Sequence, residues 1–291
     1  MSAFKERLPA NLIFIFKNMI YVFLALIARV AQKNELLVLC YHSINSNQNF
    51  HSTSTEEFYK QMDYLRKKCD IVTIETIMKL AENKKNLSRS TVAITFDDGY
   101  LDVFLNAYPY LKKYDLPATI FVTTGNVEKK MILDNMCLPM LNWGEIRVMS
   151  KNKIEIGAHT ITHPKLTQID EEQAKQEIKG SKMEIEIQIA KEVSLFAFPS
   201  GAYNQRLINL VKQLGFKAAI GGVGVIQKNS SSFSISRVEV DRSINFILFK
   251  ARLTKATNYY RKLENIIKKM FVKSQFMDRF IGAYHRSDGT I

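Results

Sequence analysis

The chain has 291 residues, of which 46% are hydrophobic, and this favours one large folded domain with appendages over two equal domains. Six prolines and 12 glycines exclude a fibrous or low-complexity protein. A formal net charge of +13 favours an anionic partner. Because the basic residues are dispersed and form no nucleic-acid-binding signature, we expect a membrane surface and no nucleic acid. Three cysteines without close spacing imply no disulfide framework.

Residues 12–31 are mostly apolar and carry basic residues on both flanks. The segment reaches the ~20 residues of a membrane-spanning helix only if Lys17 and Asn18 are included. We interpret it as an uncleaved anchor that spans the membrane or lies in its interface, because Ala28-Arg29-Val30 is a poor signal-peptide cleavage site. A helix packed on the protein's own core is the alternative. Basic residues on both sides do not indicate which side of the membrane the domain occupies.

Between residues 36 and 240, runs typical of strands alternate with runs typical of helices. The expected strands cover residues 36–42, 71–74, 91–96, 118–122, 153–158, 195–198, 218–221 and 236–240. The expected helices cover residues 55–68, 75–82, 101–114, 143–150, 171–191 and 205–214. Residues 123–142 are expected to be irregular. This alternation predicts an α/β fold with a largely parallel sheet, either open or closed into a barrel.

From residue 245 to about residue 280 the pattern is that of a basic amphipathic helix. Such a helix can lie on an anionic membrane, or it can pack on the domain with a solvated basic face, and both interpretations stay open. The predicted organisation is therefore an apolar membrane-associated segment over residues 1–34, a folded domain over residues 35–243 and a basic helical tail over residues 244–291.

Residues able to carry chemistry stand at the carboxyl ends of several expected strands. In parallel sheets, reactive groups gather along this edge. Each feature alone has an ordinary explanation, such as a surface turn for the aspartate pair, but their common placement predicts a single site. The strand-end residues are His42, Asp97, Asp98, His159, His163 and the turn Pro199-Ser200-Gly201.

The types of these residues suit metal-assisted hydrolysis. Two histidines four residues apart can bind one ion, and one of the two aspartates can complete a set of three ligands that leaves a position for water. The other aspartate would accept a proton, and a backbone N–H of the 199–201 turn would bind a developing oxyanion. His42 would protonate the leaving amine. We interpret His51, in a polar loop, and His285, near the end, as bystanders.

Three ordered motifs resemble those of the polysaccharide deacetylases, the carbohydrate esterases that share the nodulation-factor deacetylase homology domain. The motifs are Thr95-Phe96-Asp97-Asp98-Gly99-Tyr100, His159-Thr160-Ile161-Thr162-His163 and Phe198-Pro199-Ser200-Gly201-Ala202-Tyr203. The resemblance implies a distorted (β/α) barrel, with residues 35–243 as its catalytic domain. It also implies metal-dependent removal of N-acetyl groups from acetylated amino sugars, with zinc as the first candidate for the divalent ion.

The resemblance also assigns roles residue by residue. It makes Asp97 the general base and the backbone N–H of Ser200 the oxyanion donor. The three metal ligands that it implies are Asp98, His159 and His163. The family often has an arginine that holds the catalytic aspartate where this chain has Ala197, and we expect Arg237 to take that role.

A late family motif with a catalytic histidine is not visible. The early run Leu39-Cys40-Tyr41-His42-Ser43 instead resembles a branch of exopolysaccharide deacetylases whose barrel order is permuted, so His42 is expected to act as the acid or to orient the base. Tyr100, Trp143 and Tyr203 are the expected sugar contacts, although a core position is equally open for Trp143.

The expected function is thus that of a membrane-associated bacterial N-deacetylase that acts on a polysaccharide or a lipid-linked glycan. Two alternatives stay open: a non-catalytic carbohydrate-binding relative, which Ala197 and the missing late histidine suggest, and an O-acetyl esterase on the same kind of substrate. The sequence identifies neither the sugar nor the oligomeric state.

Overall fold

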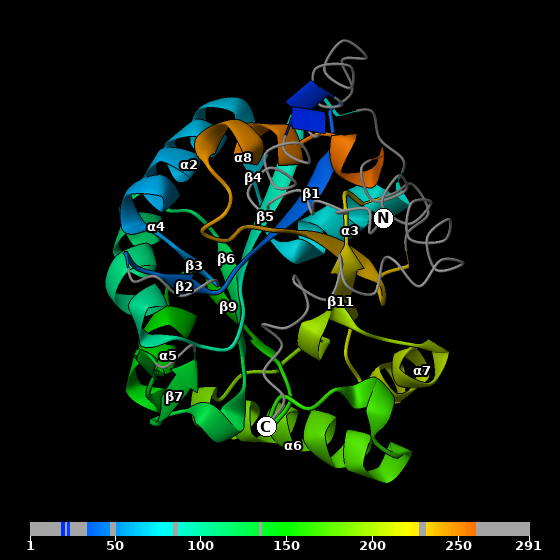
Figure 1. Ribbon diagram of the computed structural model, residues 1–291. Coiled ribbons are helices and arrows are strands. Elements are labelled where there is room, and N and C mark those ends of the chain that lie inside the picture. The colour runs from blue at the N-terminus through cyan, green and yellow to red at the C-terminus, as the bar shows by residue number, and fades with distance from the viewer. Residues whose placement is uncertain are drawn as a thin grey trace, which may run out of the picture.

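The computed structural model describes residues 19–20, 22–23, 34–46, 51–83, 87–133, 136–226 and 231–259. In this part of the chain, seven parallel strands close into a ring because β5 pairs with β1 (Figure 1). In ring order they are β1 (Leu36–Tyr41), β12 (Ile235–Glu239), β11 (Ala218–Val223), β10 (Leu195–Ala197), β9 (Ile154–Ala158), β6 (Ala118–Val122) and β5 (Ser90–Phe96). The closed ring with its outer helices confirms the predicted (β/α) barrel.

Alternate residues along the strands enter two different hydrophobic clusters, as the two faces of a strand require. Val38 of β1, Ala93 of β5 and Phe121 of β6 belong to one cluster, together with residues of β10, β11 and β12. Residues from six of the seven ring strands can share one cluster only inside the ring, so this is the barrel interior. Ile74 and Ile77 of α3 (Ile74–Glu82) join the same cluster. The strands are continuous apolar runs because both of their faces are covered.

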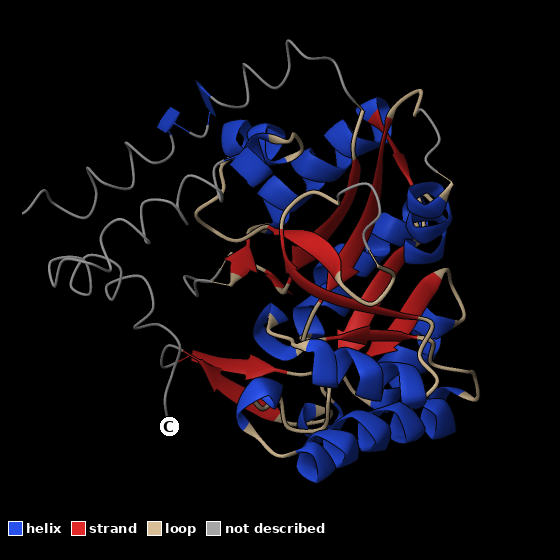
Figure 2. Ribbon diagram, turned by 90° about the vertical axis from the view of Figure 1, so that its right-hand side faces the viewer, coloured by secondary structure: helices blue, strands red, loops and turns tan. Residues whose placement is uncertain are grey.

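The larger cluster lies between the strands and the surrounding helices, which Figure 2 shows outside the sheet. Side chains of the kind that favours helix starts cap most of these helices. Ser54 caps α2, Asn142 forms a capping box with Glu145 at α5, and Asp170 caps α6. The helices besides α3 are α2 (Thr55–Lys68), α4 (Tyr108–Lys113), α5 (Trp143–Ser150), α6 (Glu171–Ile189), α7 (Gln205–Gln213) and α8 (Phe246–Arg252).

Three expected elements differ in the structure. The strand expected at 71–74 is β4 (Cys69–Ile71), because the Thr73 side chain caps α3 and Ile74 already belongs to that helix. The helix expected at 101–114 is divided into a π-helical turn, Val103–Ala107, and α4. Pro109, at the start of α4, has no N–H for the regular helical hydrogen bond, which accounts for the wider turn before it.

The third difference is a hairpin of β7 (Lys130–Leu133) and β8 (Met136–Pro139), where the sequence predicts irregular structure. No glycine marks its turn, so the usual hairpin signal is missing. A further small pairing joins β2 (Ser43–Ile44) to β3 (Ser52–Thr53).

The terminal segments are described only in part. The helix expected from residue 245 breaks after Arg252, where α8 ends, and residues 260–291 lie outside the described residues. Only four residues of the apolar 12–31 segment are described. Among the described residues, no helix has the length and apolar character that crossing a membrane requires.

Candidate active site

The loop after β5 directs its two aspartates to different partners. The Asp97 N–H continues the strand by donating to the Tyr41 carbonyl at 2.9 Å. Asp98 and Gly99 then adopt left-handed φ values of 69° and 88°. Asp tolerates this region better than most residues, and such backbone clusters at functional sites. The turn therefore separates two adjacent carboxylates that would otherwise repel each other.

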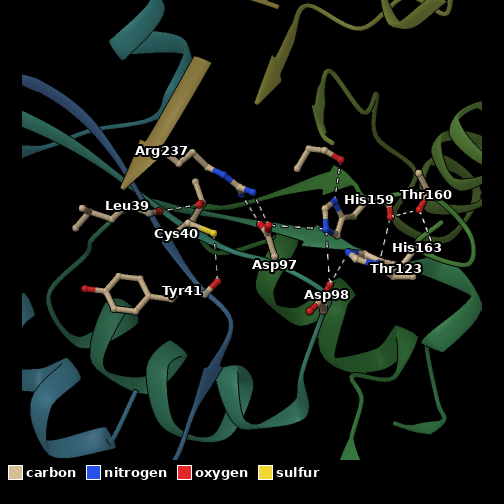
Figure 3. Close-up of polar contacts among 12 residues, drawn as sticks. Leu39, Cys40, Tyr41, Asp97, Asp98, Thr123, His159, Thr160, His163 and Arg237 are labelled. Atoms are coloured by element: carbon tan, nitrogen blue, oxygen red, sulfur yellow. Dashed lines mark hydrogen bonds and ion pairs between the residues drawn. The ribbon is translucent and has the colours of Figure 1, made fainter. Parts of the chain in front are cut away.

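Asp97 forms a bidentate ion pair with Arg237, which reaches it from β12. The Arg237 Nη1 and Nη2 groups donate to the two carboxylate oxygens at 2.6 and 2.7 Å, and both residues are buried (Figure 3). Burial alone would raise the pKa of Asp97, but the guanidinium outweighs it and holds the pKa well below its ordinary value. The arginine thus stands where the sequence analysis expects it, although its catalytic role stays a prediction.

His159 follows β9 and lies between the two aspartates. Its Nδ1 is 2.8 Å from the Ala197 carbonyl, which can only accept, so Nδ1 carries the proton and Nε2 keeps its lone pair. Nε2 lies 3.6 Å from Asp98 Oδ1 and 3.8 Å from Asp97 Oδ2. Burial lowers the pKa of His159 to about 4, against the opposing pull of Asp97. The imidazole is therefore neutral at neutral pH, as a metal ligand must be.

His163 meets the same carboxylate by a route that the spacing alone does not predict. Its Nε2 lies 3.7 Å from Asp98 Oδ1, and its ring centroid lies 4.9 Å from that of His159. The sequence suggests that the two histidines share one face of a helical turn. Instead, Thr160 and His163 adopt left-handed φ values of 68° and 60°, so an irregular loop brings the two rings together.

Asp98, His159 and His163 fit a divalent ion. Their donor atoms lie within 4.8 Å of one another. Two ligands of a tetrahedral zinc ion at ~2.0–2.1 Å are separated by about 3.4 Å, close to the donor separations found here. Although burial raises the pKa of Asp98, the nearby imidazoles of His163, His42 and His159 lower it below its ordinary value, so the carboxylate is ionised.

A second group, Cys40, His42 and Asp97, also has donor atoms close together but does not fit an ion as well. Asp97 already pairs with Arg237 through both oxygens. Burial raises the pKa of the Cys40 thiol well above its ordinary value, so the thiolate that metals bind is disfavoured. The structure therefore favours the ligand set that the sequence predicts.

His42 directly follows β1, and the structure brings His51 beside it. The two ring centroids are 5.3 Å apart, and both side chains are partly buried. The polar loop that carries His51 thus folds back beside His42, while the interpretation of His51 as a bystander stays a prediction. Burial, followed by the effect of His42, lowers the pKa of His51. The β2–β3 pairing that folds the loop back involves only two residues per strand, a signal too short to recognise in the sequence.

The turn after β10 presents one backbone amide as a candidate oxyanion donor. Ser200 and Gly201 have left-handed φ values of 55° and 65°. The amides of Gly201 and Ala202 donate within the turn, to the carbonyls of Phe198 and Pro199. The remaining amide is that of Ser200, which the sequence analysis selects. The turn begins directly beyond Ala197, the residue that orients His159.

The three expected sugar contacts occupy different environments. Tyr100 is only 2% exposed, and its hydroxyl donates to Met131 of β7 at 3.6 Å, so a sugar contact stays a prediction for it. Trp143 opens α5 and packs, partly buried, against the larger core cluster. Tyr203 is also partly buried and stacks on Phe198 with ring centroids 5.2 Å apart. A substrate contact therefore stays a prediction for Trp143 and Tyr203.

Glu177 of α6 is a residue that the sequence analysis misses. Its carboxylate accepts the N–H groups of Ile161 and Thr162 at 2.8 and 2.9 Å, and the Thr162 hydroxyl at 2.7 Å. It therefore holds the loop between the two ligand histidines. A signal exists, because Glu177 interrupts the inward helical stripe formed by the buried Ala174 and Ile178.

We expect Glu177→Gln to weaken metal binding by about 10- to 100-fold, the range typical for residues that support ligands. The amide keeps one acceptor but cannot accept all three donors. Competition of the purified variant against a chromogenic chelator measures the affinity. Glu172→Gln, on the exposed first turn of α6, is the control. Wild-type affinity in Glu177→Gln would contradict a supporting role.

Comparison with known families and sequences agrees with the motifs. A model of the polysaccharide deacetylase family matches residues 84–219. YxkH of Bacillus subtilis, provisionally named a polysaccharide deacetylase, is 28% identical over 220 residues, which cover 75% of each chain. The poly-β-1,6-N-acetyl-D-glucosamine N-deacetylase of Staphylococcus aureus is 26% identical over 233 residues, covering 71% of this chain and 79% of the relative.

Solved structures share the fold. The deacetylase PplD of Streptococcus pyogenes, in complex with acetate, superimposes with a TM-score of 0.66 at 23% identity and covers 76% of this chain and 99% of its own. IcaB from Ammonifex degensii superimposes with a TM-score of 0.65 at 24% identity, over 78% of this chain and 98% of its own.

Proposed function

Because this chain belongs to the polysaccharide deacetylase family, we propose that it uses Asp97 as base and His42 as acid to remove N-acetyl groups from an amino-sugar polymer. It is a hydrolase of acetylated glycans. The observation that carries the assignment of the base is the buried bidentate pair between Arg237 and Asp97, beside the group Asp98, His159 and His163. One carboxylate is thereby kept ionised and oriented, while its neighbour faces the two imidazoles at 3.6 and 3.7 Å.

Each residue then has a distinct task. Asp98, His159 and His163 would hold a divalent ion, which supplies Lewis-acid activation of water and of the acetyl carbonyl. Asp97 accepts the proton of the attacking water, since Arg237 keeps its carboxylate ionised and directed. The Ser200 N–H donates to the oxyanion that develops on the carbonyl oxygen of the acetyl group. His42 donates the proton that the leaving amine requires.

Arg237 also removes a reason for the binding-only alternative. That alternative rests on Ala197 standing where the family often has an arginine. The structure supplies a guanidinium to Asp97 from β12 instead, and the Ala197 carbonyl orients His159.

For the substrate we propose a polymer of N-acetylglucosamine and for the ion we propose zinc. Support for the polymer comes from the Staphylococcus aureus relative, whose name states that it deacetylates poly-β-1,6-N-acetyl-D-glucosamine. Support for zinc comes from the donor set of two imidazoles and one carboxylate, which is typical of catalytic zinc sites.

We further propose that the protein is bound to an anionic bacterial membrane. The apolar 12–31 segment with its basic flanks and the net charge of +13 support this location. Co-sedimentation of the full chain with vesicles containing a third phosphatidylglycerol tests it. Recovery of the protein in the supernatant at 0.1 M salt, with the domain folded, would contradict membrane association.

The experiment that tests the activity is acetate release from poly-β-1,6-N-acetylglucosamine before and after chelation. We expect release from the zinc-loaded enzyme, at least about a 100-fold loss after dialysis against a chelator, and recovery when zinc is restored. Metal content measured on the same samples shows whether the ion left. Release that continues undiminished in metal-free protein would contradict a metal-dependent hydrolase.

An ester substrate separates the two bond types. The same assay with an O-acetylated glucan that contains no amino sugar tests the O-acetyl esterase alternative. We expect the amide polymer to be the better substrate, because the acid role proposed for His42 serves an amine, which is a poor leaving group without its proton. Acetate release from the ester alone would contradict the N-deacetylase assignment while leaving the metal site intact.

A further inference from the structure

Asp102 stands on the turn beyond the aspartate pair, four positions after Asp98. Its carboxylate accepts the Ser43 hydroxyl at 2.7 Å and the Ile44 N–H at 2.9 Å, and it also accepts from the Asn45 side-chain amide. These residues directly follow His42 in the chain. We propose that Asp102 is a positioning residue that fixes His42 against the general base; the proposal rests on the acid role proposed for His42.

A second residue of the same turn completes the hold on β2. The Asn106 side-chain amide donates to the Ile44 carbonyl at 2.6 Å. The Asn106 carbonyl in turn accepts the Tyr59 hydroxyl of α2 at 3.0 Å. Both the N–H and the C=O of Ile44 are thus bound to the chain segment that begins with the catalytic aspartates. Ser43 and Ile44 are fully buried, so this backbone has little freedom.

The donor groups of Ser43, Ile44 and Asn45 all point at the side chain of residue 102, and an ionised carboxylate there can accept all of them. A carboxylate accepts at both oxygens, whereas an asparagine amide would direct an NH₂ group toward other donors. Burial raises the pKa of Asp102, against the lowering effects of its Ser43, Ile44 and Asn45 partners. Asp102 therefore accepts three hydrogen bonds from the segment that directly follows His42, which fixes this segment tightly.

The placement of Asp102 links the acid to the base through one short element. Asp97 and Asp98 precede Asp102, and the π-helical turn Val103–Ala107 follows it. Such turns are frequent at functional sites. His42, in contrast, lies between β1 and β2 and reaches the site from a different part of the chain. Because misplacement of a catalytic group by about 1 Å can cost about 100-fold in rate, this link has a direct effect on turnover.

A double-mutant cycle tests the proposal against a merely structural role. Asp102→Ala is made in the wild-type chain and in His42→Ala, and acetate release from the N-acetylglucosamine polymer is measured with enough enzyme to detect residual activity. We expect Asp102→Ala to lower kcat by about 10- to 100-fold with little change in KM or zinc content. In the His42→Ala background the same change should lower kcat less than about 2-fold.

Matched variants control for folding. Asp102→Asn and Ser43→Ala each remove part of the contact and are expected to lower kcat by smaller factors. If Asp102→Ala does not fold, the cycle is run with these two. Glu186→Ala, which removes a carboxylate that accepts the Val193 N–H at the far end of α6, should leave kcat unchanged.

The outcomes separate this proposal from the proposed function. Equal losses from Asp102→Ala in both backgrounds would show a general structural role and overturn the positioning role. Wild-type kcat in folded Asp102→Ala would overturn it as well. Wild-type kcat in His42→Ala would overturn the acid role of His42 and the positioning proposal together. Loss of zinc in Asp102→Ala would assign Asp102 to the metal site instead.

Discussion

Replacement of Asp97 by asparagine is expected to lower turnover at least about 1,000-fold while zinc remains bound. General-base catalysis typically contributes about 10²- to 10⁴-fold, and the amide cannot accept the proton. The metal should stay because its proposed donors are Asp98 and the two histidines of the second motif. Acetate release and metal content, measured on the same purified variant, provide the test.

The adjacent aspartate is the matched control for this prediction. Asp98→Asn should also lower turnover, but it should do so by weakening zinc binding, because Asp98 faces both imidazoles at 3.6 and 3.7 Å. The two variants thus differ in metal content rather than in activity. Full activity in Asp97→Asn, or zinc loss equal to that of Asp98→Asn, would overturn the assignment of base and ligand.

Arg237→Leu is expected to destabilise the fold and to abolish most activity. The change leaves the Asp97 carboxylate buried without its partner, and breaking a buried pair in this way typically costs about 3–5 kcal/mol. The base also loses its orientation. Urea unfolding gives the free energy of unfolding, and acetate release gives the activity.

Two further variants separate stability from catalysis at this pair. Arg237→Lys keeps the charge but loses the two-pronged contact, so it should recover much of the stability but only part of the activity. The double variant Asp97→Asn/Arg237→Leu should lose less free energy of unfolding than the two single variants lose together, because it leaves no buried charge unpaired. Additive losses in stability would show that the two groups act independently.

The parts of the site that follow from local patterns could be predicted from the sequence. Asp97, Asp98 and His159 stand where apolar runs end, and a parallel barrel brings such ends together. Arg237 could be expected because Ala197 leaves the base without the family's usual partner. In the structure the guanidinium reaches Asp97 from a strand that begins at Ile235.

The parts of the site that depend on short or distant strand pairings could not be predicted from the sequence. His51 approaches His42 only through the two-residue strands of β2 and β3, which have no periodicity to detect. The loop with the left-handed Thr160 and His163 is held by α6, where the Glu177 carboxylate accepts the Ile161 and Thr162 amides, a contact that no local pattern predicts. Tyr100 belongs to a motif, but its burial depends on the β7–β8 hairpin, which has no clear turn signal.

The pairing of Arg237 with Asp97 also determines when the enzyme becomes competent. The two residues are 140 positions apart, and the strand that carries Arg237 is the last of the barrel to leave the ribosome. The residues proposed to bind metal come from β5 and β9 and can assemble earlier. The base gains its partner only when β12 docks beside β1 and closes the ring. On the roles proposed above, activity therefore requires completion of the whole barrel.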